Sequence, residues 1–301
     1  MRKLSRRVAS IALAAAILFT TVGVSQKKVE AASTGKLSVT GYQDYSDAQK
    51  ILKEVNKYRK KNGRKALKMD RGLTNSAIMR GFETTIYIPE TSPHRRPNGK
   101  LSKSINKKII YENCAQSAGT TPKQIVKGWI DSSTHRKGLL LSNAKSVGVA
   151  AVTVVSRDGY EANTWVLDFS SSKAKKVEKS KARKQFTKNI VTKNSYLKKS
   201  YLKLDSRYGT IWETEKMQMK PTYQGKMMKE YGVYPTVINT SSFTSWKSSN
   251  PSVASVDSNG RITGNKAGTA TISAKLKTGT KITISKKIKV VPTNQQIDPW
   301  E

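Results

Sequence analysis

Apolar residues recur at helical spacing in the stretch that follows Asp44 and Ser46, either of which can cap a helix. The positions that share one helical face are Ala48, Ile51, Leu52, Val55 and Tyr58. Gly63 then interrupts the pattern and predicts the end of this helix. A second helix is predicted after Asp70, with Leu73, Ala77 and Phe82 buried at a less regular spacing.

A third helix is predicted at Thr121, where a capping box forms with Gln124 and proline occupies the first helical position. It presents Ile125, Val126 and Trp129, and its end delivers His135. Beyond it, residues 147–155 and 164–169 are rich in β-branched and apolar residues and predict antiparallel strands joined across 157–159. Helices flanking such strands predict an α+β domain.

From about Ser195 to Pro292 the pattern predicts an all-β domain. The sequence DSNG at 257–260 predicts a turn between a strand ending at Val256 and another starting at Ile262. TATISA at 269–274 alternates as a strand does, residues 282–291 are expected to form the edge of the sheet, and Trp246 is expected in the core. Between the domains, residues 171–194 are dense in lysine and predict a solvated linker, which could also bind polyanions as a flexible tether.

Residues 1–31 resemble a secretory signal peptide. Basic residues at 2, 3, 6 and 7 precede an apolar run from Ile11 to about Val24, and small residues allow cleavage after Ala31. The apolar run is short for a membrane span, so we expect no transmembrane segment in the mature chain. The protein is therefore expected to be secreted, and to be extracellular or associated with the cell wall.

The chain has 56 Lys and Arg against 20 Asp and Glu, a formal net charge of +36. Such an excess attracts polyanions. Secretion and the lack of a recognisable nucleic-acid-binding motif argue against nucleic acid, so the expected partners are anionic cell-wall polymers or acidic polysaccharides, with host or other cell-surface ligands as an alternative. Charge that serves solubility alone is the simpler interpretation. The single cysteine, Cys114, excludes an intramolecular disulfide.

The chain contains two histidines, and both lie in distinctive motifs. His94 lies in SPHRRPNG, His135 lies in SSTHRKGLL, and Glu112 lies between them in IIYENCAQ. A lone histidine is more often structural than a ligand. Two histidines and a carboxylate in three such motifs instead indicate one shared site.

Together with GWID and SVGVAAV, these motifs resemble the CAP superfamily of cysteine-rich secretory, antigen 5 and pathogenesis-related proteins, in its bacterial form. The resemblance covers residues 43–170 and implies an α-β-α sandwich. The stretch SWKSSNPSVASVDSNGRITGNKAGTATISAKL resembles group 2 of the bacterial Ig-like domains, which implies an Ig-like sandwich over 195–292. Asn98 and Cys114 stand where the CAP pattern has aspartate and an aliphatic residue.

The resemblance implies a cleft in which His94, Glu112 and His135 converge and could hold a divalent metal such as zinc, with water in an open position. The family's second acidic ligand has no clear match. Asp131 is the nearest carboxylate, four residues before His135 and on the same face if the helix continues. Arg95, Arg96 and Arg136 are expected to surround the site, to lower the pKa of both imidazoles and to favour an anionic ligand.

These features favour a secreted surface or wall-associated binding protein, with a CAP cleft for an extracellular ligand and an Ig-like spacer or adhesive module. The alternative is a divalent-metal-dependent hydrolase acting on a peptide or cell-envelope substrate. The absence of an HExxH motif weighs against an enzyme. Cys114 could act as a thiolate activated by a histidine, but a buried, inert thiol is the preferred interpretation.

Overall fold

The computed structural model describes residues 34–86, 94–117, 119–156, 159–206, 209–230, 232–278 and 280–294. The predicted signal peptide, residues 1–31, lies outside them. The N-terminal part contains β1 (Thr34–Asp44), α1 (Tyr45–Lys61), β2 (Lys68–Met69), α2 (Arg71–Ile86), β3 (Tyr111–Ser117), α3 (Pro122–Asp131), α4 (Ser133–Leu139), β4 (Ser146–Val155), β5 (Glu161–Ser170) and β6 (Arg183–Lys193).

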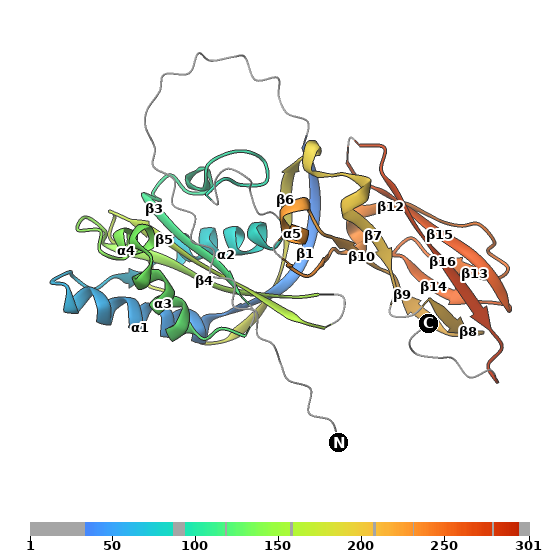
Figure 1. The fold of residues 1–301 in the computed structure, drawn as a ribbon, viewed down its shortest axis with the longest axis horizontal. Helices are drawn as coiled ribbons and strands as arrows, with labels where there is room; N and C mark the ends of the chain where they lie inside the picture. The colour runs from blue at the N-terminus through green and yellow to red at the C-terminus, as the bar shows by residue number, and fades with distance from the viewer. Residues whose placement is uncertain are drawn as a thin grey trace, which may run out of the picture.

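The strands of the N-terminal part form one sheet in the order β3-β5-β4-β1-β6, with β2 added beside β4. Helix α2 covers one face of the sheet, and α1 and α3 cover the other (Figure 1). Alternation along β4 explains the layers, since Ala150 and Val152 pack on the α2 side while Val149 and Ala151 pack on the α1 side. The predicted α-β-α sandwich is confirmed.

The predicted helices appear with the expected caps. Asp44 rather than Ser46 caps α1, through a hydrogen bond from the Asp47 backbone N–H to its side chain, and Thr121 and Gln124 form the capping box of α3. Leu73, Ala77 and Phe82 are buried on α2. The irregular spacing along α2 has a physical reason, because this helix also buries charged residues, described below.

Residues 171–194 are not a solvated linker. Strand β6 pairs with β1 along its whole length, from Asp44 opposite Arg183 to Thr34 opposite Lys193. Before β6, Glu178 accepts a hydrogen bond from Arg71, and its backbone N–H donates to the carbonyl of Met69. Phe186 and Ile190 alternate with polar residues and supply the apolar face of the strand. Composition alone predicted a linker because the lysines around them dominate the segment.

The C-terminal part is rich in strands, as expected, and also contains one short helix. Its elements are β7 (Leu202–Asp205), β8 (Thr210–Trp212), β9 (Lys216–Gln218), β10 (Lys220–Tyr223), α5 (Lys226–Glu230), β11 (Thr236–Val237), β12 (Phe243–Ser248), β13 (Ala254–Val256), β14 (Arg261–Gly264), β15 (Gly268–Leu276) and β16 (Thr283–Val291). Strand β16 is not at an edge, because it lies between β15 and a parallel β8. Trp246 is half-buried against the core, beside Phe243.

The two parts pack directly against each other. Asn239 donates hydrogen bonds to the hydroxyl oxygens of Ser38 (3.1 Å) and Thr40 (2.9 Å) in β1. Thr236 donates from its hydroxyl to the carbonyl of Thr85 at the end of α2 (2.6 Å). One contiguous set of buried apolar residues runs from β4 and α2 into the C-terminal strands. No helix in the described part of the chain is long and apolar enough to cross a membrane.

Candidate metal and ligand site

The site is built on the face of the sheet that α2 covers. Glu112 and Cys114 are two residues apart in β3, so their side chains project from the same face. Asp168 in β5 lies directly opposite Glu112 in the antiparallel register and shares this face. Three titratable side chains therefore lie together between the sheet and α2.

Four charged side chains form a buried network under the site. Arg80 of α2 donates from Nε to Glu112 Oε2 (2.8 Å) and from Nη1 to Glu83 Oε2 (2.9 Å). Arg96 donates from Nη2 to Glu83 Oε1 (2.7 Å). Arg80, Glu83 and Glu112 are almost completely buried, so each charge depends on these partners for stabilisation.

The electrostatics of the network fix the ionisation state of Glu112. Burial opposes ionisation, but the charge of Arg80 and hydrogen bonds from His94 and Arg80 outweigh it and lower the pKa of Glu112 to about 2. Burial likewise opposes the charge of Arg80, and the neighbouring Glu112 and Glu83 carboxylates raise its pKa. Both groups are therefore charged at neutral pH.

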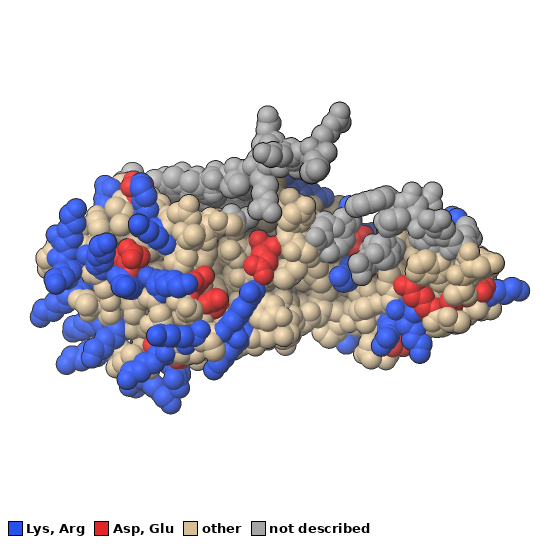
Figure 2. Space-filling model, turned by 90° about the horizontal axis from the view of Figure 1, so that it is seen from below, with Lys and Arg blue, Asp and Glu red and all other residues tan. Residues whose placement is uncertain are grey.

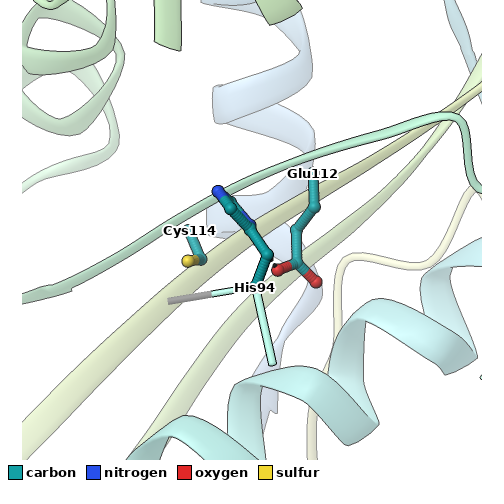
Figure 3. Close-up of side chains that lie close together, drawn as sticks. All are labelled: His94, Glu112 and Cys114. Carbon is teal, nitrogen blue, oxygen red and sulfur yellow. Dashed lines mark hydrogen bonds and ion pairs between the residues drawn. The ribbon is translucent and has the colours of Figure 1, made fainter. Parts of the chain in front are cut away.

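His94 joins this network from the loop before β3. Its Nδ1 lies 2.9 Å from Glu112 Oε1, and about a third of its side chain remains exposed. The ring lies beside Glu112 and Cys114 (Figure 3). The possible ligand atoms of these three residues lie within 4.8 Å of one another, in a group of the kind that can hold a metal ion. His94 thus connects a buried carboxylate to solvent.

His135 comes near this group but does not complete it. Its Nδ1 lies 3.0 Å from the hydroxyl oxygen of Ser132, the N-cap of α4, and its ligand atoms are outside the group formed by His94, Glu112 and Cys114. Asn113 Nδ2 donates to the carbonyl of His135 (3.0 Å) and holds α4 against β3. Burial, and then the charge of His94, lower the pKa of His135, which favours the neutral ring.

Cys114 is a free, partly buried thiol whose surroundings oppose ionisation. Burial, and then the charge of Glu112, raise its pKa to about 12. The thiolate that a nucleophile requires is therefore scarce at neutral pH. This arrangement supports the inert interpretation that the sequence favoured.

Four residues predicted to line the site have other partners. Asp131 lies on an exposed part of α3 and pairs with Lys127, because the two are one helical turn apart. Arg96 bonds to Glu83, Arg136 donates to the carbonyl of Ile130, and the exposed Arg95 donates to the carbonyl of Gly99. The predicted lowering of an imidazole pKa holds for His135, but its causes are burial and His94, not these arginines.

Sequence reasoning missed Arg80, Glu83 and Asp168. Asp168 is fully buried, and no donor among the residues that the structure describes hydrogen-bonds to either of its carboxylate oxygens. Burial, and then the charge of Glu112, raise its pKa well above the ordinary value. A protonated Asp168 becomes a donor, with Glu112 as the neighbouring acceptor. Polar residues at positions 80 and 83 of an otherwise buried helix were the signal that could have revealed the network.

The donor set fits zinc, which accepts imidazole nitrogen, carboxylate oxygen and thiolate sulfur. His94, Glu112 and Cys114 would hold the ion. Zinc binding would require deprotonation of the Cys114 thiol, and bound zinc would supply Lewis acidity.

Comparison with known proteins agrees with the fold of both parts. Residues 52–169 match the model of the cysteine-rich secretory protein family, CAP, and residues 224–288 match that of the bacterial Ig-like domain, group 2. The chain carries a CAP domain followed by a bacterial Ig-like domain. Both matches lie within the ranges predicted from sequence.

Each of three relatives matches less than half of this chain. The uncharacterized protein YkwD of Bacillus subtilis is 30% identical over 130 residues, which are 42% of this chain and 48% of the relative, so the chain spans about half the length of the curated protein it matches. An extracellular SCP-domain protein of Bacillus anthracis is 18% identical, covering 42% of this chain and 41% of its own, with a TM-score of 0.32. An outer surface protein of Borrelia burgdorferi is 15% identical, covering 43% of this chain and 98% of its own, with a TM-score of 0.34.

Proposed function

We propose that this protein is a secreted surface or wall-associated binding protein. Its CAP domain recognises an extracellular ligand at the site of His94, Glu112 and Cys114, and the Ig-like domain holds the CAP domain as a spacer or adhesive module. Relatives described as extracellular or outer surface proteins support this location, as do the signal-like residues 1–31.

One observation supports binding over catalysis. Arg80 and His94 both contact the Glu112 carboxylate, whose pKa is lowered to about 2. A general base works best when its pKa lies near the operating pH, so Glu112 is a weak base. The Cys114 thiol, with a pKa raised to about 12, is equally unsuited as a nucleophile. Arg80 and His94 therefore stabilise the negative charge of Glu112 and do not prepare it for proton transfer.

The alternative is a divalent-metal-dependent hydrolase acting on peptide or cell-envelope substrate. The grouping of His94, Glu112 and Cys114 within 4.8 Å is the observation that favours it, because a metal held there could activate water. This alternative needs both a bound ion and measurable turnover.

Metal content and turnover of the purified protein test the two functions. The double variant His94→Ala, His135→Ala is compared with wild type after purification without chelator, and Arg95→Gln serves as a control because Arg95 is exposed. Metal that disappears only in the double variant, without turnover, supports binding. Metal-dependent hydrolysis that disappears with the histidines supports the hydrolase, and equal metal content in all three proteins contradicts a metal at this site.

Association with the wall is tested separately. If opposite charges attach the protein to the wall, added salt should screen the attraction and release the protein from isolated cell walls. Release by detergent but not by salt contradicts the electrostatic mode of attachment.

A further inference from the structure

A second candidate site lies at the other end of α2. An open cavity of about 620 Å³ is lined by Tyr45, Arg71, Asn75, Glu178, Lys179, Ser180, Lys184 and Phe186. Its volume falls within the range of about 300–1,000 Å³ that small-ligand pockets occupy. Arg71 and Arg80 are nine positions apart on one helix, or about 13 Å along its axis, so this cavity is distinct from the site of Glu112.

The cavity carries positive charge without matching negative charge. Glu178 is its one acidic lining residue, and Arg71 (2.8 Å to Oε2) and the backbone N–H of Ser180 (2.9 Å to Oε1) already bond to it. Within the described part of the chain, the exposed Lys179 and Lys184 have no ion-pair partner. Two ammonium groups therefore remain to attract an anion.

Cations and aromatic rings alternate along the β6 side of the cavity. Lys184, Phe186 and Lys188 are spaced by two, so they lie on one face of the strand at intervals of about 7 Å. The Lys184 Nζ lies 5.8 Å from the centre of the Tyr45 ring, and the Lys188 Nζ lies 5.0 Å from that of Phe186. The partly exposed Phe186 ring offers apolar surface for a sugar or polyol, whereas Tyr45 is buried beneath Lys184. The lysines offer charge at a repeating interval.

The backbone around the cavity is held in place, although its sequence resembles a flexible linker. The Gln49 side chain donates to the carbonyl of Glu178 (2.9 Å), and the backbone N–H of Lys175 donates to Asp70 Oδ2 (2.8 Å). Pairing with β1 fixes β6. Because the backbone is already fixed, association need not order it, which lowers the entropy lost on binding. Lys and Arg side chains also cover much of the CAP half on the face seen in Figure 2, and this charge would attract a polyanion to the molecule.

We propose that this cavity binds an anionic glycopolymer, meaning a polymer of hydroxylated units that each carry a phosphate or a carboxylate. One unit packs on Phe186, its anionic group lies between Lys179 and Lys184, and the next anionic group meets Lys188. The proposal rests on the proposed function only in that it takes an extracellular polyanion as the partner.

Titration of the purified protein with labelled polymers at low and high salt tests the proposal. Poly(glycerol phosphate) and polygalacturonate distinguish a phosphate from a carboxylate ligand, and a single-stranded DNA 20-mer tests for general polyanion binding. The variant Lys179→Gln, Lys184→Gln is compared with Lys53→Gln, Lys57→Gln, which removes the same charge from exposed positions of α1. Phe186→Leu removes the ring and keeps apolar bulk, and thermal unfolding checks that each variant is folded.

We expect the Lys179 and Lys184 pair to weaken glycopolymer binding about tenfold at low salt and the control pair less than about twofold. We expect Phe186→Leu to weaken the glycopolymer more than DNA. The cavity would be ruled out as the glycopolymer site if both lysine pairs weakened binding equally, or if DNA bound as tightly as the glycopolymer. Either result would leave electrostatic attachment to the wall possible. If wild type binds neither glycopolymer, the wall-polymer partner in the proposed function fails as well.

Discussion

Arg80 donates two hydrogen bonds to Glu112, from Nε to Oε2 at 2.8 Å and from Nη2 to Oε1 at 3.1 Å, and so joins α2 to β3 inside the CAP domain. The same guanidinium reaches Glu83, one helical turn away. Removing one partner of a buried ion pair leaves the other charge uncompensated, which costs far more than the pair contributes. The candidate site and the stability of the domain therefore depend on the same side chain.

We expect Arg80→Met to lower the free energy of unfolding by about 3–5 kcal/mol, because Glu83 and Glu112 lose their shared cation. Urea unfolding measures this change. Arg95→Gln, at an exposed arginine, should stay within about 0.5 kcal/mol. A change of similar size in the two variants would contradict the role of the buried network.

Stability should fall in acid as Glu112 takes up a proton. Its pKa is lowered from 4.5 to about 2 in the folded state, so the unfolded state binds the proton first as the pH falls. The contribution of Glu112 is present above about pH 4.5 and is lost between that pH and about pH 2. Unfolding measured across this range should lose part of its pH dependence in Glu112→Gln. An unchanged slope would contradict the prediction.

Asp168 should have the opposite effect. Its pKa is raised in the folded state, so folding favours the protonated form and stability declines as the pH rises above the ordinary value of 3.8. Asp168→Asn imitates the protonated side chain and should raise the free energy of unfolding at neutral pH, as measured by urea unfolding. Asp131→Asn, at the exposed carboxylate of α3, should show no such gain.

Native Cys114 should resist thiol reagents. With a pKa raised to about 12, about one thiol in 10⁴ is ionised at pH 8. Labelling by a disulfide reagent at pH 8 should therefore be very slow in the folded protein and rapid in guanidinium chloride. Prompt labelling of the folded protein would show that the thiolate is accessible and would revive a nucleophilic role.

Two glycine substitutions should change stability in opposite directions. A Cβ on Gly148 of β4 would lie 2.2 Å from the backbone carbonyl carbon of Leu73 in α2, so Gly148→Ala should force helix and sheet apart and cost about 1–3 kcal/mol. A Cβ on Gly128 of α3 meets no atom within 4 Å, and Gly128→Ala should stabilise by about 0.5–1 kcal/mol through helix propensity. Thermal melts of the two variants provide the comparison, and shifts of the same sign would contradict the described packing.

Much of the fold could be predicted because its patterns are local. The helix caps at Asp44 and Thr121 and the apolar runs of β4 and β5 depend on neighbours in sequence. Strand β6 could not be recognised for two reasons. Its apolar residues, Phe186 and Ile190, lie among lysines, and its partner strand, β1, lies far away in sequence at the start of the domain.

In the candidate site, too, residues in local motifs were predicted and residues with distant partners were not. His94 and Glu112 were predicted from their motifs, and the structure brings them together. Asp131 was misplaced because the helix does not continue to His135: α3 ends at Asp131, Ser132 is extended, and His135 belongs to a separate helix, α4. Arg96 was assigned to a ligand because its buried partner, Glu83, lies on another element and carries no sequence mark of burial.

The pairing of β1 with β6 also sets the order in which the chain can fold. The register places Thr34 opposite Lys193, so this pairing forms only after nearly the whole CAP domain has emerged. Contacts of such large sequence separation form slowly, because the intervening chain must first be closed into a loop. Strand β4 reaches β1 at Tyr42 and Gln43, near the end of that strand, so the remaining length of β1 is hydrogen-bonded within the sheet when β6, the last strand of the domain, arrives.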